Sequence, residues 1–376
     1  MDRGPALTVG LRPQAPTQTP PAAGWPAASG AVLADQAIFT SIRSPVGIGY
    51  RIIASSGGLT ADEKKEITQN SPSNNSLLSS APAARALSGY PLTSGRYAVA
   101  CSCYAGIEPT ARGGERVYTH VAVVGPDAFA AFECHPLRVE AAVRAAAPQP
   151  LTNAPARLER LALSPPSGWR PSMDGHDDDI QRLVVLLALL LAQQRTVVVG
   201  SPAREGLLAR LLSGLPRALR QSLSFSVGMK CSVSRTFQLV LAGPPSGELE
   251  RSVAGHDIRI FDWSAPPERA LSAFDAWLRF VRRRWQAGRF EELDRLCAGL
   301  VEEASADQLA LVASLCEDAE SARCADAGEL MELNRKHAGE RPTSPLHADL
   351  LRQFHEAVQQ RQVQLETLAA THEPEQ

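Results

Sequence analysis

The segment Thr196–Leu212, TVVVGSPAREGLLARLL, has the order of features found in nucleotide-binding proteins: a β-branched strand, a glycine-containing turn and a helix. A phosphate-binding loop needs a glycine, four residues and then Gly-Lys-Ser/Thr, because the lysine reaches the phosphates and the hydroxyl binds magnesium. Here five residues separate Gly200 from Gly206, and Leu207 stands where the lysine is required. The dinucleotide fingerprint G-x-G-x-x-G is also missing. The segment is therefore predicted to be a plain strand–turn–helix unit, and no nucleotide cofactor is expected.

Four other residues, Cys101, Cys103, His120 and Cys134, are of the types that bind zinc or act in thiol catalysis. Cys101 and Cys103 stand two residues apart on a predicted strand, so their side chains point to the same face. Four such ligands could in principle surround Zn²⁺ tetrahedrally. The C-x-x-C spacing of a zinc knuckle is missing, however, and buried free cysteines are common. Structural thiols are the favoured interpretation, and a zinc- or thiol-dependent enzyme stays open as an alternative.

The remaining candidates suit recognition rather than catalysis. A G-x-S-x-G nucleophile elbow is missing, so no catalytic residue is predicted. Exposed arginine and aromatic side chains are favoured in protein interfaces. The residues predicted to interact with a partner are Arg43, Tyr50, Arg51, Arg112, Arg217, Arg220 and Phe225. The run Arg282–Arg284 is interpreted instead as the solvated face of a helix.

Composition narrows the classes of partner and compartment. The chain has 376 residues, enough for two or three domains, and a formal net charge of -2, so nucleic acid is not an expected partner. Seven cysteines without the spacing of a disulfide framework favour reduced thiols and a cytoplasmic protein. The most apolar segment, Leu183–Ala192, is too short to span a membrane and predicts a buried helix.

The first half of the chain predicts a small α+β domain. Residues 1–33 are rich in proline and alanine and predict a disordered leader. In residues 34–165, strands are expected at 36–42, 49–56, 95–104 and 116–125, with an edge strand at 157–163. Thr60 and Glu63 form a capping box that should open a short helix. Residues 71–91 are predicted to be mostly loop.

The second half predicts an α/β domain and then helices. In residues 166–265, a buried helix, the strand at 196–199, the following helix and further strands at 221–228, 235–243 and 256–263 make a module with a βαβ unit. Residues 266–376 are predicted to be helical. In the last helix Leu346, Leu350, Phe354 and Val358 recur at helical spacing, so this helix should pack on the core or on a partner.

Two parts of the chain resemble one bacterial family. Residues 36–78, QAIFTSIRSPVGIGYRIIASSGGLTADEKKEITQNSPSNNSLL, and residues 111–124, ARGGERVYTHVAVV, resemble the second type of N-terminal domain of GTPase-associated proteins. Residues 196–228, TVVVGSPAREGLLARLLSGLPRALRQSLSFSVG, resemble the middle domain of the same family. The middle region is also similar, more weakly, to DENN domains, which bind small GTPases.

The resemblance implies a protein that works beside a small GTPase in a multi-component, conflict-type system and has no nucleotide site of its own. We therefore expect a non-enzymatic adaptor or regulator whose partner is a small GTPase. The alternative is an exchange or activating factor, because an activator often supplies an arginine to the developing phosphate charge of its partner. Arg112, Arg217 and Arg220 are the candidates for such an arginine.

Overall fold

The computed structural model describes residues 30–44, 47–79, 81–108, 114–147, 157–166, 177–201, 204–266, 272–301 and 304–371. The predicted leader lies outside these ranges except for its end. There Val32 and Leu33 are the first residues of strand β1 rather than part of a leader.

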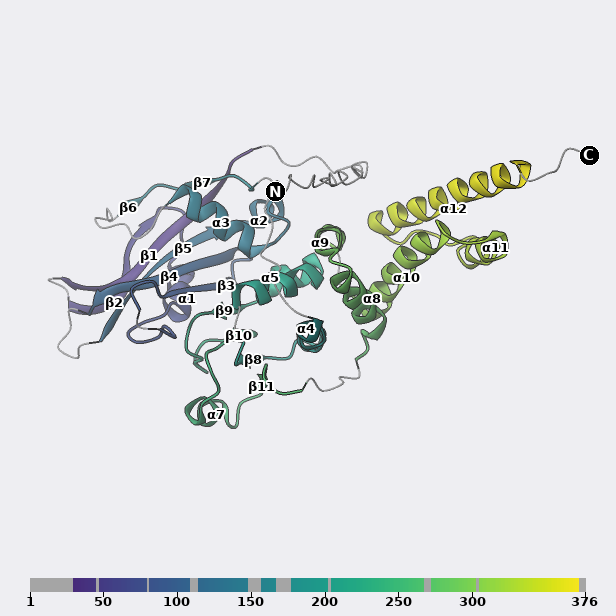
Figure 1. Ribbon diagram of the computed structural model, residues 1–376. Coiled ribbons are helices and arrows are strands. Elements are labelled where there is room, and N and C mark those ends of the chain that lie inside the picture. The colour runs from purple at the N-terminus through teal and green to yellow at the C-terminus, as the bar shows by residue number, and fades with distance from the viewer. Residues whose placement is uncertain are drawn as a thin grey trace, which may run out of the picture. The chain divides into compact units, whose positions relative to one another are not determined.

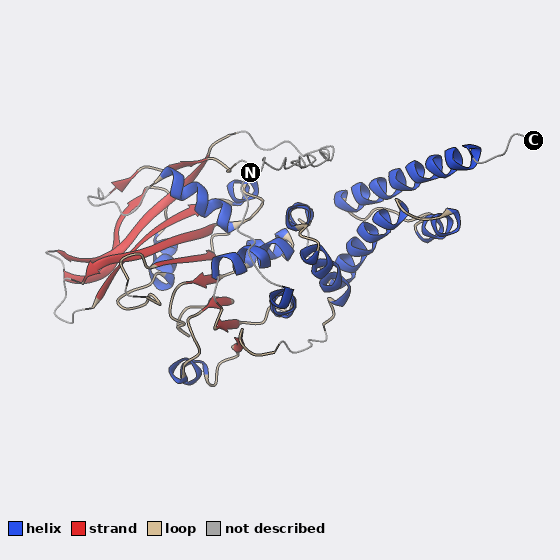
Figure 2. Cartoon of the chain, viewed as in Figure 1, coloured by secondary structure: helices blue, strands red, loops and turns tan. Residues whose placement is uncertain are grey.

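The first part of the chain forms long antiparallel strands with three short helices, as expected for an α+β region (Figures 1 and 2). Its elements are β1 (Val32–Ser44), β2 (Gly47–Ser56), α1 (Ala61–Asn70), β3 (Arg85–Pro91), β4 (Tyr97–Ile107), β5 (Glu115–Val124), α2 (Pro126–Ala131), α3 (Pro136–Ala146), β6 (Arg157–Leu158) and β7 (Leu161–Leu163). Helix α1 begins at the predicted capping box: the Thr60 hydroxyl accepts from the Glu63 N–H, and the Glu63 carboxylate accepts from the Thr60 N–H.

The second part is the predicted α/β module. Its elements are α4 (Asp177–Leu191), β8 (Thr196–Val199), α5 (Arg204–Gly214), α6 (Arg217–Ser222), β9 (Phe225–Val227), β10 (Leu239–Leu241), α7 (Gly247–Val253) and β11 (Arg259–Asp262). Strands β9, β10, β8 and β11 are parallel neighbours, and α5 lies between β8 and β9 in the chain. The Leu-rich helix α4 is buried along most of its length, as its composition predicts.

One sheet runs through both parts. The strand order in the described residues is β11-β8-β10-β9-β3-β4-β5-β1-β2-β6, with β7 paired to β1. The junction is the antiparallel pair β3–β9, where Leu87 lies opposite Val227 and Gly89 opposite Phe225. The prediction of a loop at residues 71–91 is therefore wrong for Arg85–Pro91. This strand is rich in small residues with low intrinsic β preference, and pairing on both sides makes it a strand.

The last part is helical, as predicted. Its elements are α8 (Asp275–Gln286), α9 (Phe290–Gly299), α10 (Ala306–Ala322), α11 (Ala327–Lys336) and α12 (Pro345–Thr371). Leu350, Phe354 and Val358 of α12 are buried, and α12 packs on α10 and α11, so its apolar face is covered by this chain itself.

Helix α8 joins the helical part to the α/β module. The indole N–H groups of Trp277 and Trp285 donate to the Gly214 carbonyl at 3.2 Å and to the Ser213 hydroxyl at 3.0 Å, both at the end of α5. The prediction that Arg282–Arg284 is uniformly solvated is wrong for Arg284. Its guanidinium lies over the Phe280 ring, 4.8 Å from the centroid, and pairs with Glu320 of α10 at 2.6 Å.

Among the described helices, none combines the length and the apolar composition that crossing a membrane requires.

Candidate interaction site

The β1–β2 hairpin carries three of the predicted interaction residues, Arg43, Tyr50 and Arg51. Its two strands pair from Ala37–Ser55 to Ser44–Gly47. Within the described residues β5 accompanies β1 only as far as Thr40, so the last four residues of β1 pair with β2 alone (Figure 1). Arg43 lies on this two-stranded end and is exposed, whereas Arg51 is partly buried.

The hairpin end has an unusual backbone that is fixed at its base. Gly47 and Gly49 have φ angles of 134° and 146°, which residues with a side chain rarely adopt. Tyr50 anchors the base: its ring stacks on Phe39, and its hydroxyl accepts from the Val117 N–H at 2.9 Å. Burial raises the pKa of Tyr50 above its ordinary value. Tyr50 therefore holds the hairpin against β5. Of the three predicted residues on the hairpin, the exposed Arg43 is better placed to meet a partner than the partly buried Tyr50 and Arg51.

Arg112 lies outside the described residues, but the two ends of its segment are fixed. The Glu108 N–H donates to the Gly114 carbonyl at 2.8 Å, and the Asn75 side chain accepts from the Glu115 N–H at 3.1 Å. A Cβ atom on Gly114 would lie 2.4 Å from the Asn74 side-chain oxygen, so glycine is required for this close approach.

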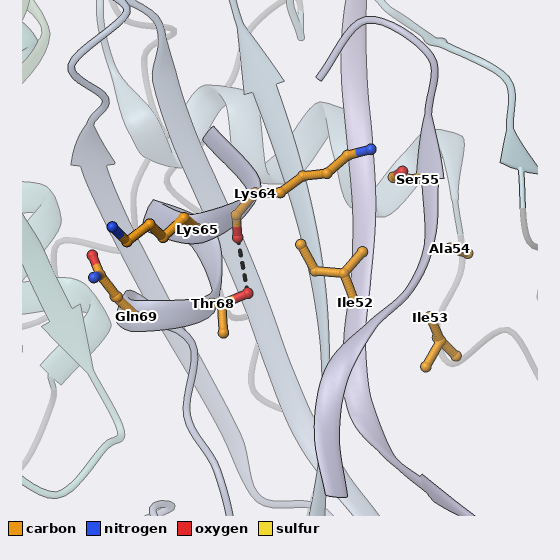
Figure 3. Close-up of a pocket in the computed structure, with 8 residues that line it drawn as sticks. All are labelled: Ile52, Ile53, Ala54, Ser55, Lys64, Lys65, Thr68 and Gln69. Carbon is orange, nitrogen blue, oxygen red and sulfur yellow. Dashed lines mark hydrogen bonds between the residues drawn. The ribbon is translucent and has the colours of Figure 1, made fainter. Parts of the chain in front are cut away.

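A groove of about 420 Å³ lies between β2 and α1, next to the hairpin in the chain (Figure 3). Lys64 extends from α1 toward Ser55 of β2, and Lys65 lies beside Gln69. The Thr68 hydroxyl donates to the Lys64 carbonyl at 2.8 Å, so it is committed to its own helix. The residues that line the groove are Ile52, Ile53, Ala54, Ser55, Lys64, Lys65, Thr68 and Gln69.

Sequence reasoning recognised the start of α1 but gave no role to its two lysines. A pair of lysines on a short helix usually marks only a solvated face. The groove arises because the helix packs beside β2, and no local pattern in the sequence reveals that packing.

Two acidic groups of helix α1 face the β3–β4 turn rather than the groove. Glu63 is buried and accepts from Ser94 at 2.8 Å and from Arg96 at 3.2 Å. Glu66 accepts from the hydroxyl of Thr93 and, at 3.1 Å, from its N–H. These two carboxylates are thus engaged by the β3–β4 turn, while the lysines line the groove.

Arg96 links α1 to a second buried carboxylate, that of Asp35 in β1. The two groups are 2.6 Å apart, and Asp35 also accepts from Arg160 at 2.9 Å and from the Ser56 hydroxyl at 2.7 Å. Burial alone would raise the pKa of Asp35, but hydrogen bonds from Arg160, Ser56 and Arg96 outweigh it and lower the pKa to about 2. The network fixes where α1 begins, and therefore where the groove lies.

Two predicted interaction residues of the later segment belong to the interior. Arg220 is fully buried; its Nε donates to the Leu215 carbonyl at 2.7 Å, and its guanidinium pairs with Asp294 at 2.8 Å. Phe225 in β9 is also fully buried, with its ring against Gly89. Neither side chain can reach a partner in this fold, which corrects that part of the prediction. Arg217, at the start of α6, is partly exposed.

The Cys/His set is not assembled into a metal centre. Cys134 lies close enough to Tyr97 to influence the pKa of that phenol. Tyr97 is four residues before Cys101 on β4, which corresponds to roughly 13 Å along a strand. Within the described residues, no group of three or more His, Cys, Asp or Glu side chains could hold a metal ion. Among the described residues, Cys101, Cys103, His120 and Cys134 therefore do not converge on one metal-binding position.

The thiols of the set are also poorly suited to nucleophilic chemistry. Burial raises the pKa of Cys101 to about 12 and raises that of Cys103. Burial lowers the pKa of His120 to about 4, and its Nε2 lies 2.7 Å from the side-chain oxygen of Gln36. The Gln36 amide donates to the Glu159 carbonyl at 2.6 Å, so its oxygen faces His120 and His120 Nε2 carries the proton. A neutral His120 and protonated thiols at Cys101 and Cys103 are the expected state at neutral pH.

Residues 196–199 form strand β8, and helix α5 begins at Arg204, both as predicted. Gly200 has a φ of 75° at the turn, and its N–H donates to the Gly243 carbonyl at 3.2 Å. A Cβ atom at Gly200 would lie 3.5 Å from a carboxylate oxygen of Asp262. A carboxylate beside this turn repels phosphate, in agreement with the spacing argument against nucleotide binding.

The geometry defines a sheet-based α+β region with a candidate surface at the β1–β2 hairpin and the groove beside it. Residues 33–198 match the family of GTPase-associated protein 1, N-terminal domain type 2. This match confirms the resemblance of the N-terminal residues to that domain. No curated protein matches the chain. The resemblance of residues 196–228 to the family's middle domain and the weaker similarity to DENN domains stay predictions.

Proposed function

We propose that this chain binds a small GTPase and acts as a non-enzymatic adaptor or regulator in a cytoplasmic, conflict-type system of bacteria. The observation that carries the proposal is the match of residues 33–198 to a GTPase-associated domain. That stretch includes the hairpin end that exposes Arg43. Arginine suits such a contact because its guanidinium offers several donors in one plane to carboxylates or phosphates. Arg51, Arg112 and Arg217 are proposed as further contacts.

The test is direct binding to small GTPases encoded in the same gene neighbourhood, each loaded with GDP or with a non-hydrolysable GTP analogue. Biolayer interferometry should give a saturable signal in at least one nucleotide state. Arg43→Glu should weaken it roughly tenfold, whereas Arg335→Glu should not, because Arg335 is 81% exposed on α11, far along the chain from the hairpin. Failure of every GTPase to bind in either state would sink the proposal.

Nucleotide kinetics separate the adaptor from an exchange or activating factor. Arg220 is no longer a candidate for an arginine supplied to the partner, because its guanidinium is buried against Asp294. Unchanged rates of nucleotide release and hydrolysis in the bound GTPase are expected of an adaptor. An acceleration of either rate by an order of magnitude or more would favour the catalytic alternative.

A further inference from the structure

The groove between β2 and α1 has an apolar floor and a cationic wall. Ile52 provides the apolar side chain of the floor, whereas Ile53 and Ala54 pack with Ile38 and Cys103 and line the groove only from behind. Lys64 extends over the groove toward Ser55, and Lys65 lies at its rim beside Gln69 (Figure 3). Within the described part of the chain, neither lysine takes part in an ion pair or a side-chain hydrogen bond. A third cation, Arg157 of β6, is exposed and lies opposite Ser55 in the sheet register.

The acidic residues of α1 do not neutralise this wall. Glu63 and Glu66 are engaged by Ser94, Arg96 and Thr93 in the β3–β4 turn. Asp62 precedes Lys64 by two residues, which corresponds to about 200° around a helix, so it points away from Lys64. It is three residues before Lys65 and lies on the same side of the helix as that lysine, but the two are not joined in an ion pair in the described part of the chain. The positive charge of Lys64 is therefore uncompensated by its own helix, and it sits next to the apolar Ile52 side chain, which water solvates poorly.

We propose that this groove binds an acidic segment of the GTPase partner, with carboxylates of that segment against Lys64 and Lys65 and an apolar side chain over Ile52. This inference rests on the proposed function and adds the chemistry of the contact. Charge complementarity selects an acidic segment, because such a segment neutralises unpaired lysines without displacing an existing ion pair. The apolar floor selects a protein segment over a small anion, because phosphate gains nothing from isoleucine.

The groove is well placed to act with the hairpin. It lies along the same strand, β2, whose other end forms the two-stranded hairpin end with Arg43. Residues 47–55 span about 30 Å at the rise of an extended strand. One partner surface of ordinary size can cover both features, since standard interfaces bury about 800 Å² on each partner.

The experiment compares the double variant Lys64→Glu/Lys65→Glu with the control Lys230→Glu in the full-length chain. Lys230 is exposed, and no side-chain contact is lost when it is changed. The double variant should bind the GTPase at least tenfold more weakly, mainly through slower association, and its binding should depend less on salt. Circular dichroism and thermal melting of all three proteins check that the fold is unchanged.

Zero-length carbodiimide crosslinking supplies an independent readout, because it joins a lysine ammonium to a carboxylate in direct contact. Crosslinks from Lys64 or Lys65 to aspartate or glutamate of the bound GTPase are expected. If the double variant binds the GTPase with undiminished affinity, or if crosslinks form only at other lysines, the groove proposal is wrong. The proposed function would be unaffected by either result. If inorganic phosphate weakens GTPase binding as much as an acidic peptide does, the groove is a simple anion site. That outcome would also overturn the groove proposal. If the unmodified chain binds no GTPase, both the groove proposal and the proposed function are wrong.

Discussion

Asp35 shows how one side chain controls the geometry of the candidate site. It is fully buried in β1 and joins Arg96, Arg160 and Ser56. A Cβ atom on Gly58 would lie 2.4 Å from its carboxylate, so the chain between β2 and α1 must carry glycine there. The turn into α1 thus wraps directly over the Asp35 carboxylate, and the groove depends on that contact.

Asp35→Asn should destabilise the fold in a way that depends on pH. The folded-state pKa of about 2 lies below the ordinary value of 3.8, so the carboxylate contributes stability that is full above about pH 4 and lost as the pH falls toward 2. We expect the variant to lose roughly 2–4 kcal/mol of unfolding free energy at pH 7, because two arginines lose their buried partner. The gap from the unmodified protein should narrow as the pH falls from 4 to 2. Urea unfolding across this pH range measures both effects.

The control for this prediction is Asp257→Asn, a change at an exposed residue that accepts one long hydrogen bond from Gln194 at 3.3 Å. It should change the unfolding free energy by less than about 0.5 kcal/mol at every pH. A gap between Asp35→Asn and the unmodified protein that stays constant down to pH 2 would contradict the assigned role of the carboxylate.

At the scale of elements, a second buried carboxylate fastens helix α9 to the rest of the fold. Asp294 in α9 pairs with Arg138 of α3 at 2.7 Å and with Arg220 of α6 at 2.8 Å. Burial alone would raise the pKa of Asp294, but the charges of Arg220 and Arg138 outweigh burial and lower it. Three helices that are distant in sequence therefore meet on one ionised group.

Asp294→Asn should cost about 3–5 kcal/mol of unfolding free energy, because it leaves the buried guanidinium of Arg220 uncompensated. The double variant Arg220→Met/Asp294→Leu should recover most of that loss, since apolar side chains can replace a buried ion pair. The matched control is Asp349→Asn, which removes an exposed pair with Arg352 and should cost less than 1 kcal/mol. Chemical denaturation of the four proteins gives the comparison, and a double variant as unstable as the single one would contradict this account.

Local signals in the sequence predicted those elements whose cause is local. The Thr60–Glu63 capping box, the β-branched strand at 196–199 and the helical spacing of Leu350 and Phe354 all gave the correct element. Strand β3 was missed because its small residues carry no strand pattern, and its partners β4 and β9 lie elsewhere in the sequence. Helix α3 was missed as well.

The candidate site was predicted only in part for the same reason. The hairpin with Arg43 follows from two adjacent strands and a proline–glycine turn, so the sequence reveals it. Arg220 resembles any arginine near the end of a short amphipathic helix, and its partner Asp294 is 74 residues away. The lysines of α1 were not recognised because a groove is a property of two packed elements and is not encoded in either one.

At the scale of the whole molecule, the seven cysteines report on every layer of the fold. Cys101 and Cys103 lie in the sheet, Cys134 between α2 and α3, Cys231 between β9 and β10, and Cys297 and Cys316 in the helical part. Burial raises the pKa of Cys101, Cys297 and Cys316 to about 12 each. Cys324, after α10, differs from all of them because it is exposed. The rate at which each thiol reacts therefore reports whether the fold is intact. It also reports whether a thiol described as buried is in fact accessible.

Native protein treated with a chromogenic disulfide at pH 8 should show one fast thiol, that of Cys324, because a thiolate must be accessible to attack the reagent. Cys324→Ser should abolish the fast phase, whereas Cys231→Ser, at a partly buried thiol whose pKa burial raises, should leave it unchanged. All seven thiols should react in urea, since each is free in the fold. A fast phase that survives Cys324→Ser and maps by mass spectrometry to Cys101 or Cys103 would contradict a structural role for those thiols. That result would instead support a chemical function for the thiols of this sheet.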